Sequence, residues 1–361
     1  VLAEFRLPKT NEKIVQILAG RGNNVHEVYD PSYQNAEALD AGVVPNDKRY
    51  LVSMPTKFRK NVWIKRGDFV VIEPIAEGDK VKAGSTVFYD KSDESVKFVS
   101  PVSGEIVEIE RGAKRRILTI KIKADKEQAY EDFGKLDVQS ANAEAVKSRL
   151  LESGCWAFIK QRPYDVVAKP NGIPKSIFIS AYASAPLAAD LDYTLQGKEA
   201  ELQAAVTALS KLTEGAVHVS VGKNGNSPLA NLNNVTVHKV SGPHPSGNVG
   251  TQINKIDPIN KGEVVWTVNA QDLVIIGELL LTGKFNAERV IALAGASVKK
   301  PRYFRTKIGS EVSTMIYDNG VDKDGNDRII SGNVLTGKQV KPDGYLDYYS
   351  NIITVIPEGD D

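Results

Sequence analysis

The chain has 361 residues, a length that suits about two to four compact domains and exceeds one ordinary hydrophobic core. Its 46 lysines and arginines nearly balance its 45 aspartates and glutamates, giving a formal net charge of +1. This balance argues against bulk attraction to nucleic acid or to anionic lipid, which only local patches could provide.

The single cysteine, Cys155, excludes an internal disulfide and any cysteine-based zinc or iron–sulfur site. It also favours a reducing, cytoplasmic compartment. The sequence shows no signal peptide, and its longest apolar run, Asp272–Leu281, is much shorter than the about 18 residues that a membrane span needs. Any membrane role is therefore expected to be peripheral.

Short β-like runs dominate the first part of the chain, residues 1–76, which we interpret as an OB-like β-barrel domain. The four runs are Ile14–Leu18, Val25–Val28, Tyr50–Met54 and Phe69–Ile75. A fifth run, Lys82–Tyr89, would complete a five-stranded barrel of the OB type. The polar segment Asp30–Arg49 is expected to be a long surface loop.

Residues 77–125 predict a second β-rich domain with an internal two-fold repeat. Two turn-rich stretches, Glu77–Gly84 and Ser100–Glu105, are each followed by an alternating strand. The expected strands are Ser85–Tyr89, Glu105–Ile109 and Ile117–Lys123. This pattern is typical of a lipoyl-like β-sandwich, but Lys91 lacks the methionine neighbours of a lipoylated lysine. We expect a plain structural module.

Helices and strands alternate over residues 126–255, which predicts a parallel sheet in a Rossmann-like α/β domain. The first helix is expected over Ala141–Glu152, with Ser140 as N-cap and Gly154 as the residue after the C-cap. A second helix near Glu199–Leu212 carries one apolar face. Strands are expected at Ser176–Ser180, Ala216–Val221 and Val235–Val240.

The last domain, residues 256–361, is predicted to contain a helix over Asn269–Leu281 and then a small β-grasp-like module. Its strands are expected at Val290–Gly295, Pro301–Lys307 and Glu311–Ile316. The fold class that follows for the whole chain is a multi-domain α/β protein.

A basic and aromatic run, Lys57–Arg66, contains five cations and no acid. Such a composition suits phosphate contacts and base stacking on an OB surface. The alternative is a solvated face with Trp63 in the barrel core. The candidate nucleic-acid-binding residues are Lys57, Phe58, Arg59, Lys60, Trp63, Lys65 and Arg66.

This part of the chain resembles the initiation-factor-1A-like S1 domain family. The matching stretches are Gly22–Val28, Tyr50–Phe69 and Pro74–Lys82. The resemblance covers residues 1–85, about the first quarter of the chain, and implies RNA binding. Two departures from the family are a missing helical and acidic tail and the apparent insertion Asp30–Arg49.

A longer resemblance, from about residue 77 to the end, is to the NqrA subunit of the bacterial sodium-translocating NADH:quinone reductase. The motifs that carry it are Ser100-Pro-Val-Ser-Gly104, Arg111-Gly-Ala-Lys-Arg115, Leu151-Glu-Ser-Gly-Cys-Trp156, Arg162-Pro-Tyr164, Pro186-Leu-Ala-Ala-Asp190, Gly242-Pro-His-Pro-Ser-Gly247, Gly250-Thr-Gln-Ile253, Val264-Val-Trp266, Gln271-Asp-Leu273, Leu281-Thr-Gly283 and Glu288–Arg302. We interpret the chain as a chimera of the two families, joined at Glu77–Gly84. In it the second family's first strands are replaced and its C-terminal part is absent after Gly359.

The second resemblance implies a peripheral subunit on the cytoplasmic face of the bacterial inner membrane, bound to the membrane subunits of a sodium pump. It implies ubiquinone as a bound substrate, no flavin and no iron–sulfur cluster, and no catalysis by the isolated subunit. The sequence itself has no Gly-x-Gly-x-x-Gly after a predicted strand, so the loop that cradles a dinucleotide or flavin phosphate is missing. No metal is expected.

A quinone site needs an apolar groove with a few polar groups near the ring carbonyls. The segment Cys155–Tyr164, which the family associates with quinone, offers three rings for stacking and two cationic donors. These residues are Trp156, Phe158, Lys160, Arg162 and Tyr164. The alternative is ordinary packing between domains by Trp156 and Phe158.

His244 lies in a glycine–proline loop, Gly242–Gly247, and could bind a quinone carbonyl or shuttle a proton. A hydrogen-bonded structural histidine is the alternative. His218 and His238 lie within predicted strands, without paired ligand spacing, and are expected to be structural. Three functions remain open at this point: a quinone-binding pump subunit, an RNA-binding OB protein and a structural assembly protein without either ligand.

Overall fold

The computed structural model describes strand backbone at residues 13–20, 25–29, 49–53 and 69–72, and then residues 76–90, 93–112 and 117–359. The candidate nucleic-acid-binding residues between 57 and 66 lie outside this set. The chain divides into two compact units, Val1–Asp79 with Glu108–Ile120 and Lys80–Val107 with Lys121–Asp361, which we describe separately. No helix among the described residues combines the length and apolarity needed to cross a membrane.

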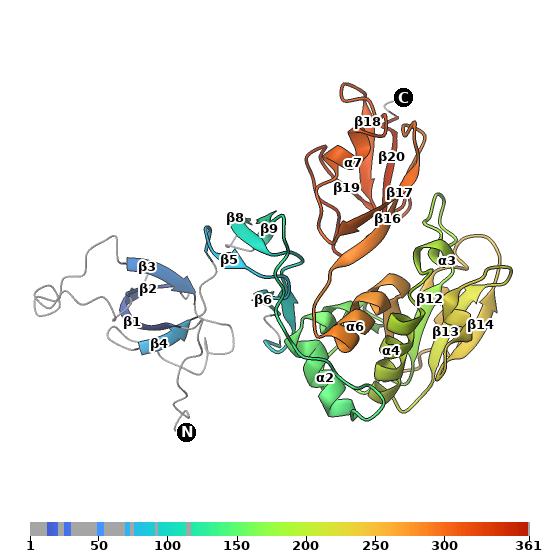
Figure 1. Cartoon of the computed structure of the whole chain (residues 1–361), viewed down its shortest axis with the longest axis horizontal. Coiled ribbons are helices and arrows are strands. Elements are labelled where there is room, and N and C mark those ends of the chain that lie inside the picture. Colours follow the sequence, from blue (N-terminus) through green and yellow to red (C-terminus); the bar gives the residue numbers. More distant parts are fainter. Residues whose placement is uncertain are drawn as a thin grey trace, which may run out of the picture. The chain divides into compact units, whose positions relative to one another are not determined.

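The first unit contains a four-stranded antiparallel sheet in the order β3-β2-β1-β4 (Figure 1). Its strands are β1 (Lys13–Gly20), β2 (Val25–Tyr29), β3 (Arg49–Ser53) and β4 (Phe69–Ile72). All four predicted strands are therefore present. The OB-like assignment of this unit stays a prediction.

The predicted fifth strand of that sheet is wrong. Residues Thr86–Tyr89 form β6, which pairs with β7 (Lys97–Val99) in a separate two-stranded sheet. The backbone N–H of Gly84 donates to the carbonyl of Ser100, and the N–H of Ser100 donates to the carbonyl of Ser85. Because this hairpin already satisfies the backbone of the segment, the segment does not join β1–β4.

The remaining strands of the predicted β-sandwich are β5 (Lys80–Val81), β8 (Gly104–Arg111) and β9 (Ile117–Ala124), in the order β5-β8-β9. A Cβ atom on Gly104 would lie 2.1 Å from the carbonyl oxygen of Lys123, so only glycine fits at this point of the sheet. The lipoyl-like interpretation stays a prediction.

A six-stranded sheet forms the centre of the second unit, in the order β11-β10-β15-β12-β13-β14. Its strands are β10 (Lys160–Arg162), β11 (Val166–Val167), β12 (Ile177–Ala181), β13 (Val217–Gly222), β14 (Thr236–Val240) and β15 (Val265–Asn269). The four strands from β15 to β14 are parallel, as expected from the alternation of helices and strands, and β10 and β11 are antiparallel additions. β15 lies beyond the boundary predicted at residue 256 and belongs to this sheet.

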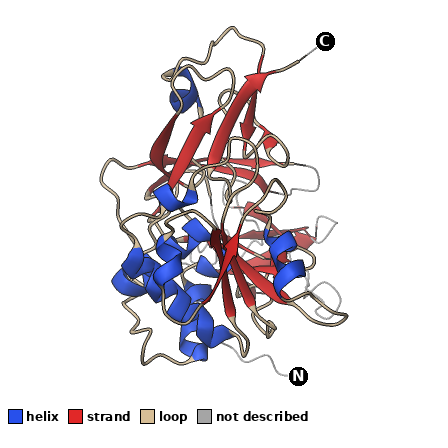
Figure 2. Ribbon diagram, turned by 90° about the vertical axis from the view of Figure 1, so that its right-hand side faces the viewer, coloured by secondary structure: helices blue, strands red, loops and turns tan. Residues whose placement is uncertain are grey.

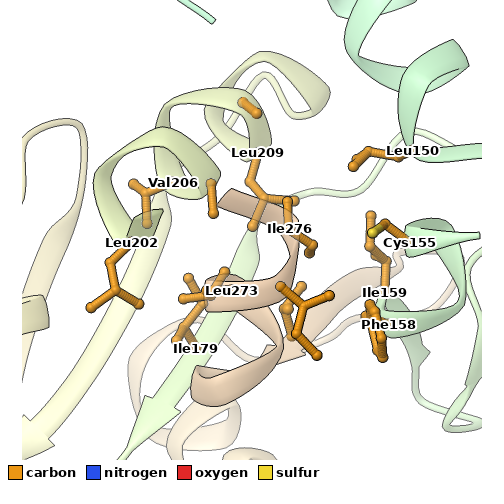
Figure 3. Packing of buried hydrophobic residues seen from close by; sticks show 14 of the residues in the cluster. Leu150, Cys155, Phe158, Ile159, Ile179, Leu202, Val206, Leu209, Leu273 and Ile276 are labelled. Carbon is orange, nitrogen blue, oxygen red and sulfur yellow. The ribbon is translucent and has the colours of Figure 1, made fainter. Parts of the chain in front are cut away.

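Helices cover both faces of the parallel strands (Figure 2). They are α2 (Ala143–Glu152), η4 (Cys155–Phe158), α3 (Leu191–Thr194), α4 (Glu199–Leu209), η5 (Ser210–Leu212), η6 (Pro228–Asn231), α5 (Val249–Ile256) and α6 (Ala270–Thr282). On one face α4 and α6 pack side by side over Ile179 (Figure 3). On the other face α5 packs on Phe178 through Ile253.

Two details of the helices follow directly from their sequences. A Cβ atom on Gly277 of α6 would lie 1.8 Å from the carbonyl oxygen of Glu201, so the glycine permits α4 and α6 to approach closely. The predicted N-cap of α2 is wrong: Asn142, not Ser140, accepts the backbone N–H of Ala145, because the Ser140 hydroxyl donates to Asp137.

A five-stranded sheet near the C-terminus has the order β17-β16-β20-β18-β19. Its elements are β16 (Glu288–Ala294), β17 (Arg302–Lys307), α7 (Ser313–Tyr317), β18 (Asp327–Ser331), β19 (Lys338–Gln339) and β20 (Ile352–Pro357). The strand predicted at Glu311–Ile316 is wrong, since most of it lies in α7. Val312 and Ile316, four residues apart, share one buried face, a spacing that a short run does not distinguish from strand alternation.

Candidate functional site

The strand order of the second unit identifies one place where a ligand site is expected. From β12 the chain moves outward to β13 and β14, and then returns through α5 to β15 on the other side of β12. In open parallel sheets, ligands bind at the carboxyl ends of the strands where the order reverses in this way. Here that place is the end of β12 and β15, near Ala181 and Asn269.

A buried ion pair lies at this place. Asp272, in the first turn of α6, pairs with Arg289 of β16, and their side chains are 0% and 2% exposed. The side chain of Asn269 also donates to Asp272, at 3.0 Å. Burial raises the pKa of the Asp272 carboxyl above its ordinary value, against the opposing effect of Arg289. The C-terminal sheet is thus joined electrostatically to the carboxyl edge of the parallel sheet.

Hydrogen bonds to backbone atoms strengthen the same junction. The side-chain amide of Gln271 donates to the carbonyl of Val290 at 2.8 Å and accepts its N–H at 3.0 Å. The backbone N–H of Asp190 donates to the Tyr303 hydroxyl at 2.9 Å. Two elements of the α/β domain, the loop after β12 and the start of α6, therefore hold the first two strands of the C-terminal sheet.

A cavity of about 350 Å³ lies beside this junction. It is lined by Tyr193, Thr194, Gln196, Lys198, Gln271, Val274, Glu278, Glu288, Arg289, Val290, Tyr303, Phe304 and Arg305. The rings of Tyr193 and Tyr303 lie 4.7 Å apart. The walls are thus partly aromatic, and the charges around them comprise two cations and two carboxylates besides Arg289.

A larger cavity, of about 610 Å³, lies between the start of α4 and η6. Its lining is Gln196, Glu199, Ala200, Gln203, Asn226, Ser227, Pro228, Asn231 and Leu232. It offers no aromatic ring and no cation, and Gln203 already bonds both the N–H and the carbonyl of Asn233. Size alone therefore does not favour it over the smaller cavity for binding a ring.

Trp156 and Phe158, two of the predicted quinone contacts, are fully buried packing residues in this structure. Trp156 donates its ring N–H to the carbonyl of Ala168 at 2.7 Å, and its ring meets Trp266 edge-on at 5.4 Å. Phe158, labelled in Figure 3, stacks on Tyr348 at 5.4 Å. Their role toward quinone stays a prediction.

Cys155, which precedes these rings, is also completely buried (Figure 3). Burial raises the pKa of its thiol to about 12. The thiol is therefore protonated near neutral pH and is not a nucleophile in this structure.

The three remaining residues of the predicted segment are more accessible. Lys160 places its Nζ atom 4.0 Å from the centre of the Tyr349 ring and 3.8 Å from Asp165, and the Arg162 Nε atom lies 3.5 Å from the same carboxylate. Tyr164 is 80% exposed. Arg162 pairs with Val265 at the beginning of β15, whereas Lys160 pairs with Thr267 nearer its carboxyl end. Only Lys160 thus approaches the strand ends where the cavity lies.

His244 lies in a different loop, between β14 and α5. Its Nδ1 atom is 3.2 Å from the Ser184 hydroxyl, which accepts the N–H of Gly247 at 2.8 Å. The structure therefore shows a hydrogen-bonded loop histidine, in a loop other than the segment that carries Lys160, Arg162 and Tyr164.

Sequence reasoning missed a contact between two histidines. His218 Nδ1 and His238 Nε2 lie 3.0 Å apart on the neighbouring strands β13 and β14. Burial lowers the pKa of each ring, and the neighbouring His238 lowers that of His218 further. Only the parallel register could have predicted this pair, because 20 residues separate its members.

Sequence reasoning also missed the lining of the cavity and the buried ion pair. Asp272 and Arg289 do stand in motifs that carry the resemblance, Gln271–Leu273 and Glu288–Arg302. Their spacing gave no sign that they touch. Among the described residues, no three His, Cys, Asp or Glu side chains gather in a way that could hold a metal ion.

Three domain models from one protein family match the chain. They are the NqrA N-terminal barrel-sandwich hybrid domain at residues 47–125, the NqrA second alpha/beta domain at residues 141–285 and the NQRA C-terminal domain at residues 290–342. The first match begins at residue 47, inside the segment that we interpreted as replaced. Nothing in these matches supports a segment related to an initiation factor.

Curated relatives agree with the domain matches. The NqrA subunit of the Na(+)-translocating NADH-quinone reductase of Marinomonas sp. is 36% identical over 306 residues, which is 83% of this chain and 68% of that protein. The proteins of the same name from Saccharophagus degradans and Neisseria meningitidis serogroup A are 37% and 38% identical, each over 79% of this chain and 64% of theirs. The chain thus spans about two thirds of the length of these relatives.

Among solved structures, an air-oxidized NAD+-reducing [NiFe]-hydrogenase has a TM-score of 0.44 and 12% sequence identity, over 62% of this chain and 50% of that chain. So distant a likeness carries no argument about this protein.

Proposed function

Since the chain belongs to the NqrA family of Na(+)-translocating NADH-quinone reductase subunits, we propose that it is a peripheral, quinone-binding subunit of such a pump. The observation that carries the proposal is the 36% identity that extends over 68% of a relative with that name. In this proposal the protein lies on the cytoplasmic face of a bacterial inner membrane and binds the pump's other subunits. It performs no redox chemistry by itself and holds neither flavin nor iron–sulfur cluster.

For the quinone contact we retain the predicted segment, in which the accessible side chains bind and the buried ones support. Tyr164 offers an exposed ring face, and Lys160 and Arg162 are cationic donors for a ring carbonyl. Trp156 and Phe158 would fix the backbone of the segment from within the core. His244 is a candidate for a separate contact through its ring nitrogens.

The proposal is tested by titrating the whole chain with a ubiquinone analogue that carries a ten-carbon tail, using calorimetry. We expect saturable binding. Replacing Tyr164 by Ala removes the stacking face, and replacing Arg162 by Gln removes a cation, so the double variant should bind about ten-fold more weakly, corresponding to about 1.4 kcal/mol.

The matched control is Tyr164→Phe, which keeps the ring and should bind like the wild type. Tyr164 is 80% exposed, so neither variant should change the thermal midpoint. An absence of binding by the wild-type chain would refute quinone binding altogether. Equal binding by Tyr164→Ala and Tyr164→Phe would refute this location.

The second hypothesis, RNA binding by residues 1–85, stays a prediction that rests on the basic run Lys57–Arg66. Phosphate contacts make nucleic-acid affinity fall steeply with salt. If the hypothesis holds, the chain binds single-stranded RNA in a salt-dependent way, and a Lys57→Ala, Arg59→Ala and Lys60→Ala variant loses that binding. RNA affinity that ignores salt and these three residues would exclude it.

A further inference from the structure

We propose that the cavity of about 350 Å³ between α3, α6 and the β16–β17 hairpin is a binding site for an uncharged aromatic or quinonoid ring that carries a carbonyl group. The ring lies against Tyr193, Tyr303 and Phe304, and its carbonyl accepts from Arg289. Because a quinone headgroup belongs to this class, the inference rests on the proposed function. It places the headgroup at a site other than the Lys160–Tyr164 segment.

The place and the size of the cavity fit a ligand of this kind. Its lining includes Gln271 and Arg289, at the carboxyl end of β15, where the strand order reverses and ligand sites are expected. A volume of about 350 Å³ is at the lower end of the range for small-molecule pockets, enough for one substituted ring.

Aromatic walls give the cavity its shape. Tyr193 of α3 and Tyr303 of β17 lie 4.7 Å apart with an angle of 42° between their planes, and both remain partly exposed, at 52% and 37%. Phe304 continues the wall. Flat rings gain from stacked or edge contacts at such separations, and exposed tyrosine faces are costly only while they lack a partner.

One hydrogen-bond donor in the lining has no partner. Arg289 bonds the carbonyls of Tyr348 and Ser350 through Nη1, at 2.8 and 3.1 Å, and Asp272 through Nη2. Its Nε atom is buried and makes no hydrogen bond to the described part of the chain. A buried donor without an acceptor is unfavourable, and a ligand carbonyl entering the cavity would satisfy it.

The charges around the cavity favour an uncharged ligand. Asp272 already neutralises Arg289. At the rim, Lys198 is paired with Glu201 at 3.0 Å, and Arg305 with Glu288 at 2.7 Å. Glu278 adds a further carboxylate, which would repel an anion. An aromatic carboxylate or a phosphate is therefore disfavoured relative to a neutral ring with a carbonyl.

The test uses the whole chain and two matched probes, 1,4-naphthoquinone and its 2-sulfonate, which differ by one negative charge. We expect the neutral probe to bind at least ten-fold more tightly. Tyr193→Ala removes one aromatic wall and Val274→Phe fills the cavity, so each should weaken binding of 1,4-naphthoquinone by ten-fold or more. Tyr193 is half exposed, and its truncation should leave the thermal midpoint unchanged. Tyr164→Ala is the control and should bind like the wild type.

Each outcome separates the two ideas. If Tyr164→Ala loses binding while Tyr193→Ala and Val274→Phe retain it, the cavity is refuted and the proposed function stands. If the sulfonate binds as tightly as the neutral probe, the preference for an uncharged ligand is refuted. If the wild-type chain binds neither 1,4-naphthoquinone nor the long-tailed ubiquinone analogue, the proposed function fails, and this inference fails with it.

Discussion

Two regions of the second unit are held together by different physical means. Between the parallel sheet and helices α4 and α6, nearly every contact is apolar, with Leu202, Val206 and Ile276 among the fully buried side chains (Figure 3). At the junction with the C-terminal sheet, a buried ion pair and hydrogen bonds from Asp272, Gln271 and Tyr303 carry the contact. Apolar layers tolerate changes of shape, whereas polar junctions demand that each partner be present.

The largest effect is expected at the polar junction. Removing the carboxylate with Asp272→Ala leaves the Arg289 charge buried without compensation, which should lower the free energy of unfolding by about 3–5 kcal/mol. Denaturant unfolding followed by circular dichroism measures the loss. The double variant Asp272→Leu with Arg289→Met removes both charges and should recover part of it. A single variant as stable as the wild type would show that the pair is not buried in solution.

The next effect concerns the closest approach within the apolar layer. A Cβ atom at Gly277 would meet the Glu201 carbonyl at 1.8 Å, so Gly277→Ala forces α4 and α6 apart. We expect a loss of about 1–3 kcal/mol, despite the higher helix propensity of alanine. Gly250→Ala, in α5 with no atom within 4 Å of the added Cβ, is the matched control and should be neutral or slightly stabilising. Equal behaviour of the two variants would contradict the close packing.

A smaller effect distinguishes the two candidate N-caps of α2. Asn142→Ala removes the side chain that accepts the Ala145 N–H at 2.8 Å and should cost about 1 kcal/mol. Ser140→Ala loses only an exposed contact with Asp137 and should cost less. Thermal unfolding of the two variants tests the assignment, which would be reversed if Ser140→Ala were the less stable one.

The smallest effect is a pH dependence from the histidine pair. Because the folded-state pKa values of His218 and His238 lie below their ordinary value of 6.5, the unfolded chain takes up protons first as the pH falls. Stability from this pair is therefore complete above about pH 7 and declines as the pH falls below the unfolded value. His238→Gln should reduce the difference in thermal midpoint between about pH 7 and pH 5. An unchanged difference would mean that other groups cause the decline.

The regular part of the fold can be predicted because it follows from local pattern. The apolar face of residues 199–212 and the cap and glycine around α2 locate helices, and the β-branched runs at 176–180 and 216–221 locate central strands. Short antiparallel additions such as β10 and β11 carry too few residues to show a period. The helix α7 has the pattern of a strand because Val312, Thr314 and Ile316 alternate.

The candidate site is far less accessible to sequence reasoning. The segment Cys155–Tyr164 has the rings and cations that a quinone needs, but packing removes Trp156 and Phe158 from the surface and register separates Arg162 from the strand ends. The cavity combines Tyr193, Val274 and Tyr303, which are far apart in the chain and meet only when the C-terminal sheet docks. No local signal announces that docking.

The facing of Tyr193 and Tyr303 has a mechanical consequence. One ring belongs to α3 of the α/β domain and the other to β17 of the C-terminal sheet, so the gap between them measures the tilt of one module against the other. The Gln271 amide grips β16 at Val290 and serves as the pivot. A guest wedged between the tyrosines would therefore act as a lever, and a neighbour pulling on the C-terminal sheet could expel it.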